Sequence, residues 1–235
     1  MLVNQYKNKK MKKNLSPAFL LVSVAFTVCL IASNLFATKI FSLAGINLPG
    51  AVVIFPISYI LNDCLAEVWG YRKARLIIWT GFLMNLFVVL AAQLIIWLPP
   101  APFWDASPHF DYVFKMAPRV FIASLLAFLV GSTMNAYVLS RMKVASQGKY
   151  FPVRAIVSSL AGEVLDSAIF MPIAFFGTPV KILLGMMLAQ VTFKVLYEIV
   201  ILPVTTRFVN YLKRLENEDV FDGEISYNPF KIRDI

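Results

Sequence analysis

Long apolar stretches separated by short polar connections dominate the pattern of this chain. Most of them approach the roughly 20 residues that an α-helix needs to cross the hydrocarbon core of a bilayer. The pattern predicts six transmembrane helices, at residues 18–36, 48–64, 76–98, 120–139, 153–176 and 182–208. No connection between them is long enough to form a soluble domain, so the stretches predict one all-α membrane unit.

Composition supports this prediction. Hydrophobic residues make up 59% of the chain and charged residues only 15%, and the mean hydropathy is +0.72. A soluble globular protein carries about 25% charged residues, so this chain lacks the polar groups to cover a water-facing surface of its size. The composition excludes a soluble enzyme and favours an all-α integral membrane protein.

The basic residues predict the orientation. Seventeen of the 22 Lys and Arg residues lie before the first span, in the second and fourth connections and in the tail. The alternate connections carry only Lys39, Lys115, Arg119 and Lys181. Because cytoplasmic loops are enriched in Lys and Arg, we expect a basic cytoplasmic N-terminus (1–17), a six-helix domain (18–208) and a cytoplasmic tail (209–235). The net charge of +9 then reflects topology, and we expect no nucleic-acid partner.

The chain offers little to an enzyme or a metal. Its two cysteines and single histidine, Cys29, Cys64 and His109, cannot supply the four ligands of a structural zinc site. There is no Walker-type glycine loop, no zinc-protease histidine pair and no serine with a positioned base. We therefore expect no cofactor, no metal and no catalytic activity. A solute carrier or a substrate-capturing membrane protein fits better than a pore.

Ionisable residues inside the predicted spans are the main functional candidates, because such groups are costly in hydrocarbon and usually face a protein interior. They occur in pairs three or four positions apart, which places each pair on one face of a helix. The pairs are Asp63 with Glu67, Glu163 with Asp166, and Lys194 with Glu198.

Helix rise predicts which of these groups meet. At about 1.5 Å per residue, Glu163 lies about 15 Å and Asp166 about 20 Å from the cytoplasmic end of their span. Lys194 lies about 18 Å from the outer end of its own span, and Asn85 about 13 Å into the third. We therefore expect these groups to meet near the bilayer centre. Asp63 lies closer to the cytoplasmic side, at a depth where Asn135 of the fourth span could join it.

Simpler interpretations of the charged pairs stay open. Lys194 and Glu198 could form an ion pair that only holds their own helix. The acidic pair of the second span could sit among the headgroups, paired with Arg72 or Arg75. Arg119, at the outer mouth of the fourth span, is typical of a residue that snorkels to the interface. Two carboxylates on one face at mid-depth fit such a structural role least well.

Local patterns in four of the spans resemble one known family. The second span reads Phe55-Pro56-Ile57-Ser58-Tyr59 and continues to Asp63, Glu67 and Gly70, similar to that family's FPxSYxxxDxxxExxG stretch. The later patterns are Arg119 with Asn135, where the family often has Asp, then Gly162-Glu163 with Asp166-Ser167, and Phe193-Lys194-Val195 with Tyr197-Glu198 and Pro203. Over about 33–208 the chain resembles the queuosine precursor transporters, also called the vitamin uptake transporter family.

The resemblance implies a six-helix fold similar to the vitamin-binding S-components, and import of 7-deazaguanine bases such as preQ0, preQ1 or queuine for making queuosine in tRNA. A 7-deazaguanine presents N1–H and its 2-amino group side by side, so one carboxylate can accept both, while Lys194, Asn85 or Gln190 could donate to O6. The candidate substrate-binding residues are Glu163, Asp166, Lys194, Glu198, Asn85, Asp63, Asn135, Arg119, Phe170 and Tyr197.

Two other function classes stay open at this point. A subunit similar to an S-component would capture a vitamin or nucleobase and need a separate ATP-driven module. A structural membrane protein is the third class, and the number of uncompensated acids argues against it. The expected surroundings are the lipid bilayer of the inner membrane and a small-molecule substrate, and the sequence leaves a homodimer open.

Overall fold

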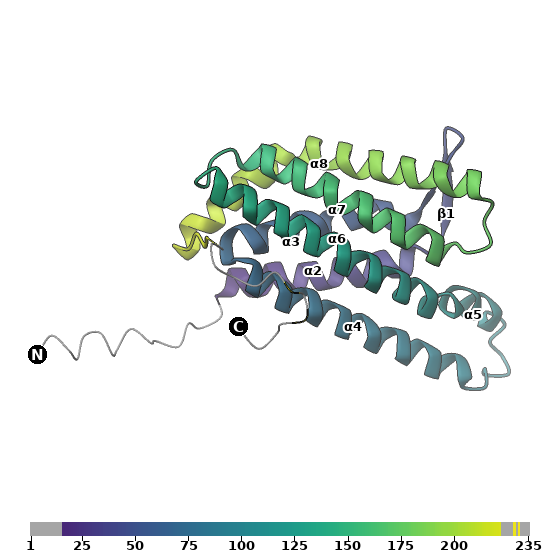
Figure 1. Cartoon of the computed structure of the whole chain (residues 1–235). Helices are drawn as coiled ribbons and strands as arrows, with labels where there is room; N and C mark the ends of the chain where they lie inside the picture. Colours follow the sequence, from purple (N-terminus) through teal and green to yellow (C-terminus); the bar gives the residue numbers. More distant parts are fainter. Residues whose placement is uncertain (1–15, 222–227, 229, 231–235) are drawn as a thin grey trace, which may run out of the picture.

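The computed structural model describes residues 16–221, 228 and 230, which form an elongated helical bundle (Figure 1). The helices are α2 (Pro17–Phe36), α3 (Phe55–Trp69), α4 (Tyr71–Trp97), α5 (Ser107–Lys115), α6 (Ala117–Ala145), α7 (Phe151–Ala174) and α8 (Val180–Glu216). All except the short α5 lie side by side along the bundle (Figure 1). Within these described residues, five helical stretches are long and apolar enough to cross a membrane, while α3 has only 15 residues.

The second predicted span begins differently from the expected helix over 48–64. Strands β1 (Ile40–Leu43) and β2 (Ile46–Pro49) form an antiparallel hairpin, followed by the 3-10 helix η1 (Gly50–Val53), and α3 begins only at Phe55. Pro56 lies in the first turn of α3, where its missing N–H has no partner to lose. Hydropathy alone could not separate the apolar end of the hairpin from the helix.

The structure differs from the predicted spans at other boundaries too. Helix α8 continues to Glu216, eight residues past the predicted end at 208, so the first part of the predicted tail is helical. The connection after α4 contains α5, whose first turn holds a proline. We call the end of the bundle near β1 and β2 the hairpin end, and the opposite end, where α3 ends, the Glu67 end. Figure 1 shows the start of α2 and the end of α8 at the Glu67 end.

Burial is reversed relative to a soluble bundle. Large apolar side chains are exposed on the outside, as with Leu83, Phe87 and Leu90 of α4. Charged side chains such as Glu163 and Lys194 are buried at 2% exposure each. An apolar exterior around a polar interior suits a protein whose solvent is lipid. The fold is therefore that of a multi-pass membrane protein.

Helices α6 and α7 pack closely at two glycines. A Cβ added at Gly162 would lie 2.7 Å from the carbonyl oxygen of Gly131, and one added at Gly131 would lie 2.8 Å from that of Gly162. Small residues let transmembrane backbones approach each other. This approach places Asp166 of α7 beside Tyr59 of α3, since the same added Cβ at Gly131 would lie within 2.9 Å of atoms of both.

We expect Gly162→Ala to destabilise the protein by about 1–3 kcal/mol, because the new methyl group forces the two backbones apart. The matched control is Gly185→Ala in α8, where nothing lies within 4 Å of an added Cβ. This control should melt at or slightly above the wild-type temperature, since Ala is the better helix former. Thermal unfolding of the detergent-solubilised protein measures both, and equal melting temperatures would contradict the close packing.

Candidate functional site

Lys194 forms the centre of the bundle interior. Its Nζ lies 2.6 Å from Glu163 Oε2 and 2.9 Å from Asp166 Oδ2. It also lies 4.1 Å from the centroid of the Phe55 ring. The predicted meeting of Glu163, Asp166 and Lys194 is therefore confirmed, and Lys194 pairs with α7 rather than forming the alternative pair with Glu198 of its own helix. We call these three charged residues the Lys194 centre.

A small cavity adjoins the Lys194 centre. Its lining comes from five elements and comprises Asn34, Ala51, Val52, Phe55, Asp166, Phe170, Gln190 and Lys194. The space open to a water-sized sphere is about 10 Å³, close to the least that one water molecule requires. The cavity is thus closed, and any ligand larger than water would enter only after the surrounding elements move apart.

Two cavity residues carry polar atoms without protein partners. The side-chain nitrogen Nδ2 of Asn34 and the oxygen Oε1 of Gln190 are buried without a hydrogen bond among the described residues, although Gln190 Nε2 donates to Ser167 Oγ at 3.3 Å. An unpaired buried polar group costs roughly 1–3 kcal/mol. A polar ligand in an enlarged cavity would recover that cost.

A second acidic pair lies between the Lys194 centre and the Glu67 end. Asp63 of α3 accepts a hydrogen bond from Asn135 Nδ2 of α6 at 2.5 Å, which confirms that these two side chains meet. Glu198 of α8 is close enough to Asp63 for the two carboxylates to interact electrostatically. Both acids are buried, at 1% and 7% exposure. We call Asp63 and Glu198 the acidic pair.

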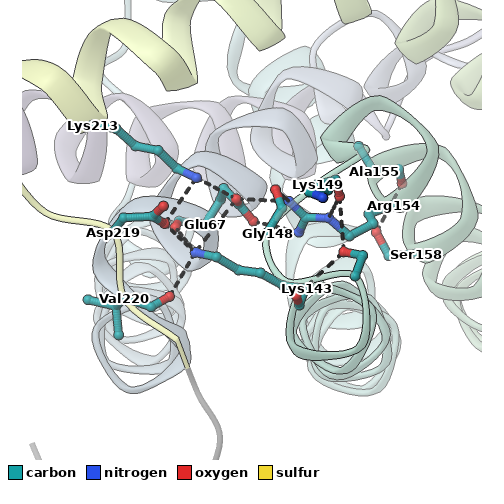
Figure 2. A network of polar contacts seen from close by, with 11 residues as sticks. Glu67, Lys143, Gly148, Lys149, Arg154, Ala155, Ser158, Lys213, Asp219 and Val220 are labelled. Atoms are coloured by element: carbon teal, nitrogen blue, oxygen red, sulfur yellow. Dashed lines mark hydrogen bonds and ion pairs between the residues drawn. The ribbon is translucent and has the colours of Figure 1, made fainter.

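At the Glu67 end, one carboxylate joins three cations from three other helices (Figure 2). Arg154 of α7 donates two hydrogen bonds to Glu67, at 2.8 and 3.0 Å. Lys213 of α8 lies 2.6 Å from Glu67 Oε1, and Lys143 of α6 lies 3.6 Å from it. This Glu67 network ties four helices together, and the sequence patterns had not indicated these partners.

The segment after α8 docks onto the same network (Figure 2). Asp219 Oδ1 lies 2.6 Å from Lys143 Nζ and 3.0 Å from Lys213 Nζ. Burial opposes ionisation of this side chain, but the hydrogen bonds from Lys143 and Lys213 outweigh it and hold the pKa of Asp219 below its usual value. Lys143 also donates to the carbonyl of Val220 at 2.7 Å. The segment therefore covers the Glu67 end of the bundle.

Besides Asp63, Asn135 and Glu198, three further predicted site residues lie away from the cavity. Arg119 is exposed and donates to the carbonyls of Ile173 and Phe176 at 2.8 and 2.9 Å, so it holds the end of α7. Tyr197 is half-buried and stacks on Phe193. Asn85 of α4 is buried with Nδ2 unpartnered, but it is not among the cavity residues. Their roles in substrate binding stay predictions.

The structure adds residues that the sequence patterns had not singled out as binding groups. Asn34 lies near the end of α2, and its place at the cavity depends on how α2 packs. Phe55 and Tyr59 belong to a quoted motif, but only the fold shows that Lys194 Nζ lies 4.1 and 5.8 Å from their ring centroids. A buried amide in an apolar span was the signal that could have identified Asn34.

Comparison with known proteins gives a consistent result. The model of a family described as "Putative vitamin uptake transporter" matches residues 49–208. The chain is 27% identical to a "Probable queuosine precursor transporter" of Bacillus subtilis, over 75% of this chain and 77% of that protein. It is 24% identical to the "Queuosine precursor transporter" of Escherichia coli, over 84% and 89% of the two chains. No solved structure matches.

We expect Lys194→Met to destabilise the protein strongly, by about 3–5 kcal/mol, because it leaves two buried carboxylates without their cation. The control is Lys115→Met in α5, which removes an exposed ion pair to Asp111 worth at most about 1 kcal/mol. Thermal unfolding in detergent compares the two variants. A Lys194→Met protein as stable as the Lys115→Met protein would contradict the central role of this cation.

Proposed function

The chain belongs to the vitamin uptake transporter family, and from this premise we propose that it imports queuosine precursors, which are 7-deazaguanine bases, across the inner membrane. Relatives named as queuosine precursor transporters support the substrate class. We place the binding site at the Lys194 centre, because this centre combines carboxylates with nearby polar groups that have no hydrogen-bond partner among the described residues. That combination is the observation on which the proposal mainly depends.

The chemistry of the base fits the Lys194 centre. A carboxylate of Glu163 or Asp166 can accept hydrogen bonds from N1–H and the 2-amino group together, a paired contact with good geometric specificity. The oxygen O6 needs a donor, and Lys194 or the free amide nitrogen of Asn34 can provide one. Binding the base would therefore replace part of the ion pairing inside the centre by hydrogen bonds to the ligand.

Two aromatic rings provide flat surfaces for the base. Phe55 and Phe170 both line the small cavity, from α3 and α7 respectively. Offset stacking or edge-to-face contact between aromatic rings is favourable beyond simple burial of area. In the closed state the Lys194 ammonium occupies the face of Phe55, so we propose that Lys194 moves from this ring when the base enters.

A route through the protein follows from the cavity and from the two ends. Ala51 and Val52 of η1 line the cavity, so outward movement of η1 and the hairpin would open it at the hairpin end. The Glu67 network and the docked segment close the opposite end. Because the cations gather at the Glu67 end, the positive-inside rule makes that end cytoplasmic. On this proposal the base enters at the hairpin end and leaves past the Glu67 network.

We expect Asp166→Asn and Glu163→Gln to lower uptake of labelled preQ1 at least tenfold. A carboxylate has two oxygens that accept hydrogen bonds side by side, whereas an amide has one acceptor oxygen and an NH2 group that donates. Uptake is measured in cells that cannot synthesise the base, with the amount of protein in the membrane checked for each variant. Asp111→Asn on α5 is the matched control and should transport normally. Normal uptake by both site variants would contradict the assigned site.

A liposome assay distinguishes an autonomous carrier from a capture subunit. The purified chain in liposomes should move preQ1 without ATP or any other protein. A 7-deazapurine lacking the 2-amino group should compete poorly, because it leaves a buried acceptor unpaired. Binding of preQ1 without movement across the liposome membrane would favour the capture subunit that needs a separate module.

A further inference from the structure

The acidic pair faces no cation. Among the described residues, no Lys, Arg or His lies within ion-pair distance of Asp63 or Glu198, whereas each of the other buried acids, Glu67, Glu163 and Asp166, has at least one such partner. Asp63 has the amide of Asn135 as its hydrogen-bond donor. The hydroxyl of Ser159 on α7 is a donor close to the Glu198 carboxylate, and Glu198 Oε1 has no hydrogen bond within the part of the chain that the structure describes.

Buried polar atoms without partners surround this pair. The hydroxyl of Tyr59 has no hydrogen-bond partner among the residues that the structure describes, and Tyr59 is 2% exposed. A Cβ added at Gly131 would lie 2.7 Å from this hydroxyl and 2.9 Å from Asp166 Cβ, so the phenol lies beside Asp166, and it also interacts electrostatically with both acids of the pair. The side-chain oxygen of Asn135 is likewise unpartnered. The site is thus polar and enclosed, with donors and acceptors available to a small ligand.

The other acids around the acidic pair make it more necessary that a cation or a proton balances the negative charge of the pair. The groups that act on Asp63 are Glu198 of α8, Glu67 of its own helix and Glu163 of α7, with Asn135 of α6 as donor. Glu67 is already neutralised by its three cations, and Lys194 is shared between the acids of α7. Two like charges in a low-dielectric interior cannot both stay ionised without a cation or a proton.

We propose that the acidic pair is a proton site, and that a proton bound there travels inward with each imported base. This inference rests on the proposed function. In the step, an O–H bond forms on one carboxylate when the pair takes a proton from the aqueous phase at the hairpin end. The same bond breaks when the proton leaves at the Glu67 end, so one proton and one base enter in each cycle.

The position of the pair gives the coupling a physical basis. Asp63 belongs to α3 and Glu198 to α8, and these two helices pack against each other. With one proton bound, a hydrogen bond can join the two carboxyl groups and the helices stay together. Without it, two negative charges repel each other across the same interface. Protonation therefore favours the closed state, and loss of the proton favours separation of α3 and α8.

The test uses the purified full chain in liposomes with labelled preQ0, whose nitrile carries no charge of its own. Potassium and valinomycin hold the membrane potential at zero. With the outside more acidic by about two pH units, one proton per base supports at most about a hundredfold accumulation. We expect at least a fivefold accumulation, which a protonophore abolishes and a sodium gradient does not replace.

Two variants identify the site. Neither Asp63 nor Glu198 lines the cavity to which we assign the base. Asp63→Asn and Glu198→Gln should therefore still bind preQ0, seen as a ligand-dependent rise in melting temperature, and equilibrate it without accumulation, while Asp111→Asn accumulates it normally. Equilibration by the wild type whatever the pH gradient, or accumulation driven by sodium, would overturn the proton site alone. Accumulation by both variants would overturn the assignment to this pair. Absence of both binding and uptake would overturn the proposed function, and the coupling with it.

Discussion

The ion pairing of Lys194 with Glu163 and Asp166 is the interaction on which the interior of this protein depends. Buried charged groups in a membrane bundle are tolerable only when they are closely paired, and here one ammonium lies within 3 Å of both carboxylates. The cation comes from α8 and both acids from α7, so the pairing fixes how these helices lie. It also brings α3 into register, because the Phe55 ring contacts the same ammonium group.

Much of this arrangement could be predicted from the sequence because it depends on helical geometry alone. Residues three or four positions apart share a helix face, and the rise per residue gives the depth of each group. These two rules were sufficient to bring Glu163, Asp166 and Lys194 together. Charge asymmetry between connections also gave an orientation, which stays a prediction. The long apolar stretches indicated where most of the spans lie.

The features that the sequence did not predict depend on the packing of whole helices. The partners of Glu67 lie on α6, α7 and α8, 76 to 146 residues further along the chain, and no local spacing identifies them. The hairpin escaped prediction because its last residues are as apolar as a span. Arg119 lies at the start of its helix, as predicted, but its carbonyl partners depend on where α7 stops.

The interface between α3 and α8 contains attraction at both ends and, in the middle, two acids that repel each other when no proton is bound. Phe55 contacts Lys194 on one side, and Glu67 pairs with Lys213 on the other. Between them lie the like-charged groups of the acidic pair. Because the outer contacts hold the helices together whatever the protonation of the pair, separation requires that one of them also be lost. A base that draws Lys194 away from Phe55 would release the first contact. Undocking of Asp219 would leave an excess of positive charge on Lys213 and Lys143 at the Glu67 contact. On the proposed function, this one helix interface would link events at the two ends, which is a physical requirement for opening one side at a time.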